Sequence, residues 1–160
     1  MGRPCSCTRA ASTTLLDTTT NSPAETEAAG EQFGKGLQQG DLVLLAGDLG
    51  AGKTTFVRGA VRGSGSPAHV ASPTFQLVRV YSGPLQIAHV DLYRLEAGAE
   101  LTDLGLEELL DQGAVLVEWG DRLETSLNVR WDRGPEGALL SIEHLGGDRR
   151  RVRLMRGLQR

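Results

Sequence analysis

The sequence has few cysteines and no long apolar run. Its two cysteines, Cys5 and Cys7, are separated by one serine, so neither can cross-link a core, and a lone C-x-C is a weak metal signal. No stretch approaches the roughly 18 apolar residues of a membrane-spanning helix. The first seven residues lack the apolar segment of a secretory signal. We therefore expect a cytoplasmic protein without membrane association.

The length of 160 residues corresponds to about one ordinary domain. No internal repeat or long low-complexity segment divides the chain. The apolar fraction of 39%, together with 21 glycines, is ordinary for a globular protein. We expect a polar leader at residues 1–13, one domain over residues 14–156 and a tail at residues 157–160, so a single core must serve every function.

The net charge is small, but the charged residues are unevenly distributed along the chain. The formal charge is −3, yet residues 1–147 carry 11 basic and 19 acidic side chains, and residues 96–121 contain eight acids and neither Lys nor Arg. A basic run at a chain end is most often a solvated edge strand or tail, and the alternative is a contact with nucleic acid or protein. The arginines of this run are Arg149, Arg150, Arg151, Arg153, Arg156 and Arg160.

A capping signature predicts the first helix. Ser22-Pro23-Ala24-Glu25 has the form of a capping box, with serine as N-cap, proline at the first helical position and glutamate reaching back. The helix should run from Pro23 to residue 37 or 38, with Gly40 as its stop signal. Its three glycines, at 30, 34 and 36, indicate either close packing against another element or, more simply, a marginal helix.

Short apolar runs predict the strands. Residues 43–46 and 114–117 are continuously apolar, which is typical of strands covered on both faces in a parallel sheet. Residues 75–81 with 85–90, and 138–144 with 150–155, predict two hairpins. A short strand at Leu15-Leu16 and helices near residues 53–62, 101–110 and 121–126 complete the predicted order.

A phosphate-binding motif follows the first buried strand. Residues 47–54, GDLGAGKT, fit G-x-x-x-x-G-K-[ST] between a predicted strand and a predicted helix. Glycines allow positive φ and leave no Cβ, so backbone N–H groups can turn toward phosphate oxygens. Lys53 should reach the β- and γ-phosphates, and the Thr54 hydroxyl should bind Mg²⁺. The expected nucleotide-binding residues are Asp48, Leu49, Gly50, Ala51, Gly52, Lys53, Thr54 and Thr55.

The motif and the order of elements together define the expected fold. We predict an α/β, single P-loop NTPase-like domain with a central, mostly parallel sheet, antiparallel hairpin additions and helices on both faces. No guanine-reading N-K-x-D motif occurs, because neither Asn21 nor Asn128 is followed by Lys. The sequence therefore favours ATP over GTP.

Two acids end predicted strands and could complete a metal site. Asp91 and Glu118 each close an apolar run, and the carboxyl ends of parallel strands meet at one edge of the sheet. Either carboxylate could approach Mg²⁺ or the γ-phosphate, and the alternative is an acid that returns the chain to solvent. We expect Asp121, three residues beyond Glu118, to be solvated or to cap a helix.

Other polar residues near these strands have open interpretations. Thr74, within Ser72-Pro73-Thr74-Phe75, could contact the γ-phosphate and release it after hydrolysis, or could lie in a plain turn. Trp119 could pack over the site or anchor its strand. His69, His89 and His144 form no plausible metal cluster, and we interpret them as structural or surface residues, with His89 the most buried.

These segments together resemble one bacterial family. Four segments occur in the order and spacing of the TsaE (YjeE-type) ATPases of tRNA threonylcarbamoyladenosine biosynthesis. They are the phosphate-binding motif, Ser72–Phe75, His-Val-Asp-Leu-Tyr-Arg-Leu at residues 89–95, and Val117-Glu118-Trp119. The resemblance spans residues 15–154. The last two segments are the specific ones, since many ATPases share the loop. Gly120-Asp121, where many relatives have a proline-containing pair, departs from the pattern.

The resemblance implies a function and a site. TsaE proteins are cytoplasmic, bind ATP and Mg²⁺, and have a weak ATPase activity that the TsaD–TsaB transferase complex stimulates during tRNA modification. By this likeness Thr54 and Glu118 are metal ligands, Lys53 binds phosphate, Asp91 is an acid needed for activity, and Thr74 belongs to a switch-like loop. Contact with tRNA would be indirect, or direct through Arg149 to Arg153.

Two other functions fit parts of the sequence. A small-molecule P-loop kinase would use residues 96–111 as a lid, but such lids generally hold phosphates with arginines and this segment has none. A nucleic-acid binder without catalytic activity would use the C-terminal arginines, and its affinity would depend strongly on salt. The ordered motifs favour the partner-stimulated ATPase.

Overall fold

A computed structural model of the chain describes residues 13–71, 76–92, 105–118 and 137–156. Among these residues no helix is long and apolar enough to cross a membrane. In chain order the elements are β1 (Thr13–Thr20), α1 (Pro23–Gly34), β2 (Leu42–Ala46), α2 (Lys53–Gly63), β3 (Val78–Tyr81), β4 (Gln86–Asp91), α3 (Leu106–Gln112), β5 (Gly113–Glu118), β6 (Gly137–Gly146) and β7 (Arg149–Arg156).

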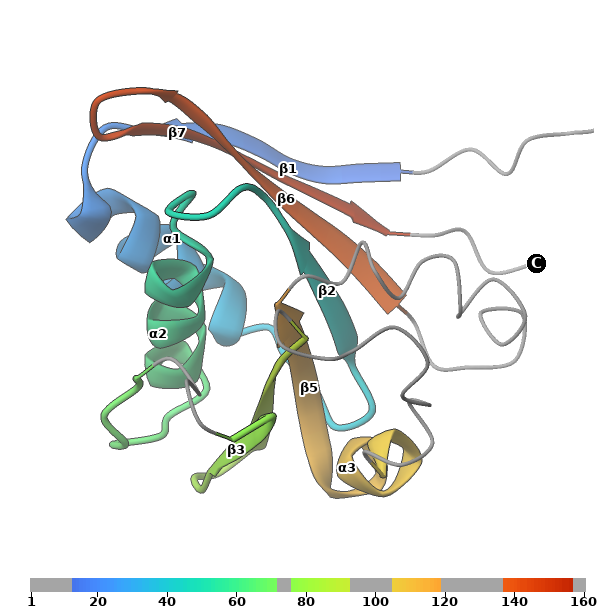
Figure 1. The fold of residues 1–160 in the computed structure, drawn as a ribbon. Coiled ribbons are helices and arrows are strands. Elements are labelled where there is room, and N and C mark those ends of the chain that lie inside the picture. Colours follow the sequence, from blue (N-terminus) through green and yellow to red (C-terminus); the bar gives the residue numbers. More distant parts are fainter. Residues whose placement is uncertain (1–12, 72–75, 93–104, 119–136, 157–160) are drawn as a thin grey trace, which may run out of the picture.

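The strands form one sheet in the order β1-β7-β6-β2-β5-β4-β3 (Figure 1). At its centre β6, β2, β5 and β4 pair in parallel. Antiparallel pairing adds β3 to β4 at one edge, and β7 and then β1 at the other. The predicted sheet, mostly parallel with hairpin additions, is therefore confirmed, and both predicted hairpins are present as β3–β4 and β6–β7.

Helices cover both faces of the sheet. Successive residues of a strand point to opposite faces, and those of β2 divide accordingly between two apolar clusters. Val43 and Leu45 join the cluster that packs against α1 and α2. Leu42 and Leu44 join the cluster that packs against α3. Because β2 is apolar on both faces, it occupies the centre of the sheet, and its carboxyl end carries the phosphate-binding motif.

Glycines bring α1 and α2 into direct backbone contact. A Cβ on Gly30 or Gly34 would collide with carbonyl oxygens of α2, and a Cβ on Gly59 or Gly63 would collide with carbonyl oxygens of α1. Only ordinary contact would meet a Cβ on Gly36. Close packing therefore explains two of the three glycines in α1 and its C-terminal turn, and the simpler expectation of a marginal helix is wrong for them.

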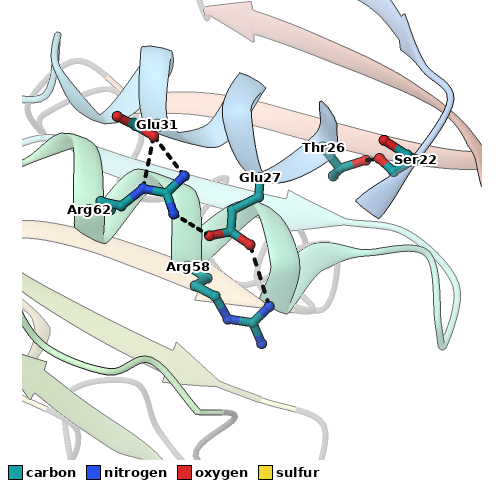
Figure 2. A network of polar contacts seen from close by, with 6 residues as sticks. All are labelled: Ser22, Thr26, Glu27, Glu31, Arg58 and Arg62. Carbon is teal, nitrogen blue, oxygen red and sulfur yellow. Dashed lines mark hydrogen bonds and ion pairs between the residues drawn. The ribbon is translucent and has the colours of Figure 1, made fainter. Parts of the chain in front are cut away.

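Ion pairs flank this glycine contact (Figure 2). Arg62 of α2 lies 2.6 Å from Oε1 of Glu27 and 2.7 Å from Oε2 of Glu31, both on α1. Arg58 lies 3.7 Å from the other carboxylate oxygen of Glu27. These side chains are partly exposed, so solvent screens the pairs and each contributes little to stability. The pairs align the two helices, while the glycines set how closely they approach.

The start of α1 follows its predicted signature with one difference. Ser22 is the N-cap, its Oγ accepting the Glu25 N–H at 3.1 Å, and Pro23 is the first helical residue. The Glu25 carboxylate reaches one residue further back than predicted and accepts the Asn21 N–H at 2.7 Å. Both interactions satisfy N–H groups at the helix start, which is the purpose of the capping box.

The end of α1 comes earlier than predicted, at Gly34. The chain then tightens, because the Gly36 N–H bonds to the carbonyl of Phe33, three residues back, at 3.0 Å. Gly40, with φ of 88°, lies in the turn that leads into β2, and the prediction that it stops the helix is wrong. The chain must turn here because β2 enters the sheet two residues later.

Other boundaries differ modestly. β1 spans eight residues where a short strand was predicted, because it pairs along most of its length with β7. β3 begins at Val78, later than the predicted strand, and α3 covers Leu106–Gln112. Of the leader predicted over residues 1–13, Thr13 begins β1 and residues 1–12 lie outside the described residues, as does the helix predicted over residues 121–126.

Candidate functional site

The phosphate-binding motif lies at the carboxyl end of β2, between that strand and α2. Gly50 and Gly52 have φ of 76° and 106°, a left-handed region that favours glycine. Gly52 is the N-cap of α2 and offers no side chain to cap it. The N-terminus of α2, which carries the positive end of the helix dipole, therefore faces the loop. We refer to residues 47–52 as the phosphate loop.

Lys53 folds back across the phosphate loop. Its ammonium Nζ donates to the carbonyl of Gly47 at 2.6 Å and to that of Asp48 at 3.0 Å. Its side chain is largely buried, with 5% of the residue exposed. A compact positive charge is thus held against the loop backbone, and its contact with the β- and γ-phosphates stays a prediction.

Thr54 and Glu118 are in contact next to the phosphate loop. The Thr54 hydroxyl donates to Oε1 of Glu118 at 2.9 Å. Thr54 is in the first turn of α2, and Glu118 ends β5, the strand beside β2 in the sheet. Glu118 is buried, with 4% exposed. The sheet therefore brings together the two residues expected to bind metal, although they are 64 positions apart in sequence.

Asp91 ends the next strand, β4, and pairs in register with Glu118. It is half-buried, and its N–H donates to the carbonyl of Leu77 at 3.0 Å. The two acids thus lie side by side at the carboxyl ends of neighbouring parallel strands, as expected. The phosphate loop begins at the same end of the sheet, where β2 ends.

His89 contributes a contact that the sequence did not suggest. It is completely buried on β4, and its Nε2 lies 2.9 Å from Oε1 of Glu118. An ionised carboxylate only accepts, so we assign the proton to Nε2, and Nδ1 has no hydrogen-bond partner among the described residues. Two donors, Thr54 and His89, therefore converge on one carboxylate oxygen. A polar residue inside an otherwise apolar strand was the available signal.

Tyr81 packs beside this histidine. The two ring centroids are 6.4 Å apart, and the Tyr81 hydroxyl donates to the carbonyl of Ala71 at 3.2 Å. Burial raises the pKa of the Tyr81 hydroxyl above its ordinary value. The Tyr81 ring lies beside the His89 imidazole, and its hydroxyl ties the end of β3 to the backbone at Ala71.

Three of the six C-terminal arginines contact other parts of the fold. Arg150 donates to the carbonyl of Ala51 in the phosphate loop at 2.9 Å, and Arg151 pairs with Asp17 of β1 at 2.8 Å. Arg153 approaches Glu143 at 4.0 Å. The run was predicted to be a solvated edge strand or tail; its strand, β7, lies between β6 and β1, so the edge position is wrong, although the side chains of Arg151 and Arg153 are 43% and 41% exposed. Arg149 remains exposed. A direct tRNA contact through Arg149 to Arg153 stays a prediction.

Several predicted site residues cannot be placed. Thr74 and its loop, the segment 93–95, Trp119 and Asp121 lie outside the described residues, as do Cys5 and Cys7. The nucleotide-binding group from Asp48 to Thr55 lies wholly within the phosphate loop and the first turn of α2, where Leu49 is the most exposed large apolar residue, at 79%.

The oxygens of Thr54 and Glu118 fit Mg²⁺. This hard cation prefers oxygen ligands and commonly takes few from the protein, the others coming from phosphate and water. No group of three or more His, Cys, Asp or Glu that could hold a metal occurs in the described part of the chain. The two oxygen donors therefore suit an ion whose remaining ligands are phosphate and water.

A glycine-rich loop after a central parallel strand, followed by a helix and faced by an acid from the neighbouring strand, defines the P-loop class of α/β proteins. Within that class the chain belongs to the TsaE family. The family model described as "Threonylcarbamoyl adenosine biosynthesis protein TsaE" matches residues 20–151. The resemblance stated from the sequence is thereby confirmed.

Individual relatives agree with this assignment. The tRNA threonylcarbamoyladenosine biosynthesis protein TsaE of Bacillus subtilis is 40% identical over 136 residues, which cover 83% of this chain and 80% of that protein. The protein of the same name from Streptomyces coelicolor is 40% identical over 126 residues, covering 72% and 84%. The crystal structure of Bacillus subtilis YdiB is similar, with a TM-score of 0.73 and 30% identity over 92% of this chain and 88% of that one.

Proposed function

We propose that this chain binds ATP with Mg²⁺, hydrolyses it weakly to ADP and phosphate, and does so faster with the TsaD–TsaB transferase complex during threonylcarbamoyladenosine formation on tRNA. Family membership supports the pathway. The observation that carries the nucleotide chemistry is the 2.9 Å contact between Thr54 and Glu118 at the mouth of the phosphate loop. It joins two Mg²⁺-type ligands to a phosphate-binding loop.

The chain's own residues divide the work of binding. Thr54 and Glu118 would hold the ion, which when bound neutralises charge on the β- and γ-phosphates. Lys53 lies within the loop and would exchange its bonds to the carbonyls of Gly47 and Asp48 for bonds to phosphate oxygens. The N-terminus of α2 adds partial positive charge. In hydrolysis the oxygen of one water bonds to the γ-phosphorus, while the bond between that phosphorus and the oxygen that leaves with ADP breaks.

Asp91 is the candidate for an acid beside the transferred phosphoryl group. It pairs in register with Glu118, and its half-buried position at the strand end leaves it close to the proposed ion site. We assign Thr74 to the loop that responds to the γ-phosphate. The strand ends are largely taken up by nucleotide binding, so we propose that hydrolysis acts on the partner complex and not on a second small substrate.

ATP turnover with and without purified TsaD–TsaB tests this proposal. We expect slow phosphate release by the chain alone and a clear increase with the complex. Lys53→Ala and Glu118→Gln should abolish the increase, while Glu108→Gln, an exposed acid on α3, should retain it. Stimulated turnover that survives both site substitutions would show that the site is assigned wrongly.

The same experiment separates the kinase alternative. A small-molecule kinase would consume ATP only with an acceptor and would yield a phosphorylated metabolite instead of free phosphate. Release of inorganic phosphate that rises with TsaD–TsaB, with no phosphorylated product, is the result expected here. A phosphorylated acceptor formed without the complex would favour the kinase.

A further inference from the structure

Arg150 contacts the outer side of the phosphate loop from the opposite end of the chain. Its Nε donates to the carbonyl of Ala51 at 2.9 Å, and its Nη2 donates to the carbonyl of Gly50 at 3.4 Å. Nη1 is anchored to the carbonyls of Gly147 and Arg149 at 2.8 and 3.0 Å. One guanidinium thus bridges the turn of the β6–β7 hairpin to the loop, across 99 positions of sequence.

This contact sets the direction of a loop N–H group. The carbonyl of Ala51 and the N–H of Gly52 belong to one planar trans peptide, so they point in opposite directions. Because the Ala51 carbonyl points at Arg150, the Gly52 N–H points away from Arg150. The preceding peptide is fixed as well, since the Ala51 N–H donates to the carbonyl of Asp48 at 3.0 Å.

A glycine-rich loop needs such an external restraint. Gly50 and Gly52 have positive φ and no Cβ, and glycine has the largest backbone freedom to lose. A contact that fixes the loop before the ligand arrives lowers the ordering cost of binding. Arg150 is the second residue of β7 and pairs on both sides, with Thr20 of β1 and His144 of β6, so its backbone is a firm anchor.

The positive charge of Arg150 is not paired with a carboxylate among the described residues. Among the described residues Arg150 forms no ion pair, whereas Arg151 pairs with Asp17 and Arg153 approaches Glu143. Its four hydrogen bonds all go to neutral carbonyl oxygens. A partly buried guanidinium that pairs with none of the described carboxylates raises the positive potential at the loop, which favours a phosphate ligand.

We propose that Arg150 is a positioning residue of the phosphate loop, which it orients through the carbonyls of Gly50 and Ala51 for a nucleoside polyphosphate. This inference rests on the proposed nucleotide binding. Its role is to hold the Gly52 N–H toward the phosphates and to supply positive charge behind the loop. The sequence alone assigns Arg150 to a solvated basic run, because no local pattern links residue 150 to residue 51.

The test compares Arg150→Met and Arg150→Lys with Arg149→Met, the exposed neighbour on the same strand. ATP affinity in Mg²⁺ is measured by calorimetry, and the Gly52 amide resonance is measured by NMR in nucleotide-free protein. We expect Arg150→Met to weaken ATP binding about 10- to 100-fold, the range for losing a charged hydrogen bond. Arg150→Lys keeps the charge but lacks the forked guanidinium, so its ATP affinity should lie between those of the wild type and Arg150→Met.

The controls keep the outcome decisive. Arg149→Met should bind ATP within about twofold of wild type and leave the Gly52 resonance unchanged. If Arg150→Met fails to fold, the comparison of Arg150→Lys with wild type carries the test. Wild-type affinity and an unshifted Gly52 resonance in the Arg150 variants would overturn the inference. Absence of ATP binding by the wild type would instead overturn the proposed function, and the Gly52 comparison would still decide the role of Arg150.

Discussion

The hydroxyl of Thr54 donates a hydrogen bond of 2.9 Å to Oε1 of Glu118. One residue lies in the first turn of the helix after the phosphate loop, and the other ends the neighbouring strand. The parallel pairing of β2 with β5 brings them together, because it aligns the strand ends at one edge of the sheet. Placement of the site therefore depends on the sheet, and the chemistry proposed for it depends on two oxygen ligands.

Replacement of His89 should separate positioning from bulk packing. His89→Leu removes a donor to the buried carboxylate of Glu118 and should lower the free energy of unfolding by about 1–3 kcal/mol. His89→Gln can place an amide N–H near the position of Nε2 and should retain most of the stability and the Mg²⁺-dependent ATP affinity. Urea unfolding and ATP titration measure both quantities. Equal losses in the two variants would mean that the imidazole acts only by filling space.

Glycine substitutions should divide according to their place in the helix contact. Gly59→Ala would force a Cβ into the backbone of α1 and should destabilise the fold by about 1–3 kcal/mol or more, despite the higher helix propensity of Ala. Gly36→Ala meets only ordinary contact and should be neutral or stabilising by up to about 1 kcal/mol. Denaturant unfolding measures both changes. Similar stabilities for the two variants would contradict the close contact of α1 with α2.

The pair Asp17–Arg151 should give a stability that depends on acid pH. The hydrogen bond from Arg151 lowers the pKa of the Asp17 carboxyl in the folded state. The stabilisation is therefore present above the ordinary Asp pKa of about 3.9 and is lost as pH falls through the lower, folded value. NMR titration of Asp17 should show this low pKa in the wild type and a return toward the ordinary value in Arg151→Met. An unchanged titration in that variant would remove the ion pair as the cause.

Patterns that are local in sequence predicted most of the fold. The apolar runs of β2 and β5 and the turns of both hairpins specify their elements within a few residues, so their positions could be read directly. The phosphate loop was equally accessible, because its glycines and Lys53 act through backbone geometry and charge at fixed spacing.

Contacts between distant segments could not be predicted in the same way. The partner of Arg150 lies 99 positions away, and that of His89 lies on another strand, 29 positions away. The interpretation of Gly30 likewise depended on knowing that α2 packs against α1. In each case the local residue type permits several roles, and the tertiary fold selects one.

The Mg²⁺ dependence of ATP binding provides the decisive measurement for the proposed site. ATP affinity is determined over a range of Mg²⁺ concentrations for wild type, Glu118→Gln and the control Glu108→Gln. We expect Mg²⁺ to strengthen ATP binding in the wild type and the control, and Glu118→Gln to weaken the apparent Mg²⁺ affinity at least about tenfold, since even indirect supports of metal ligands have effects of this size. Unchanged Mg²⁺ dependence in a folded Glu118→Gln protein would contradict the Thr54–Glu118 metal site.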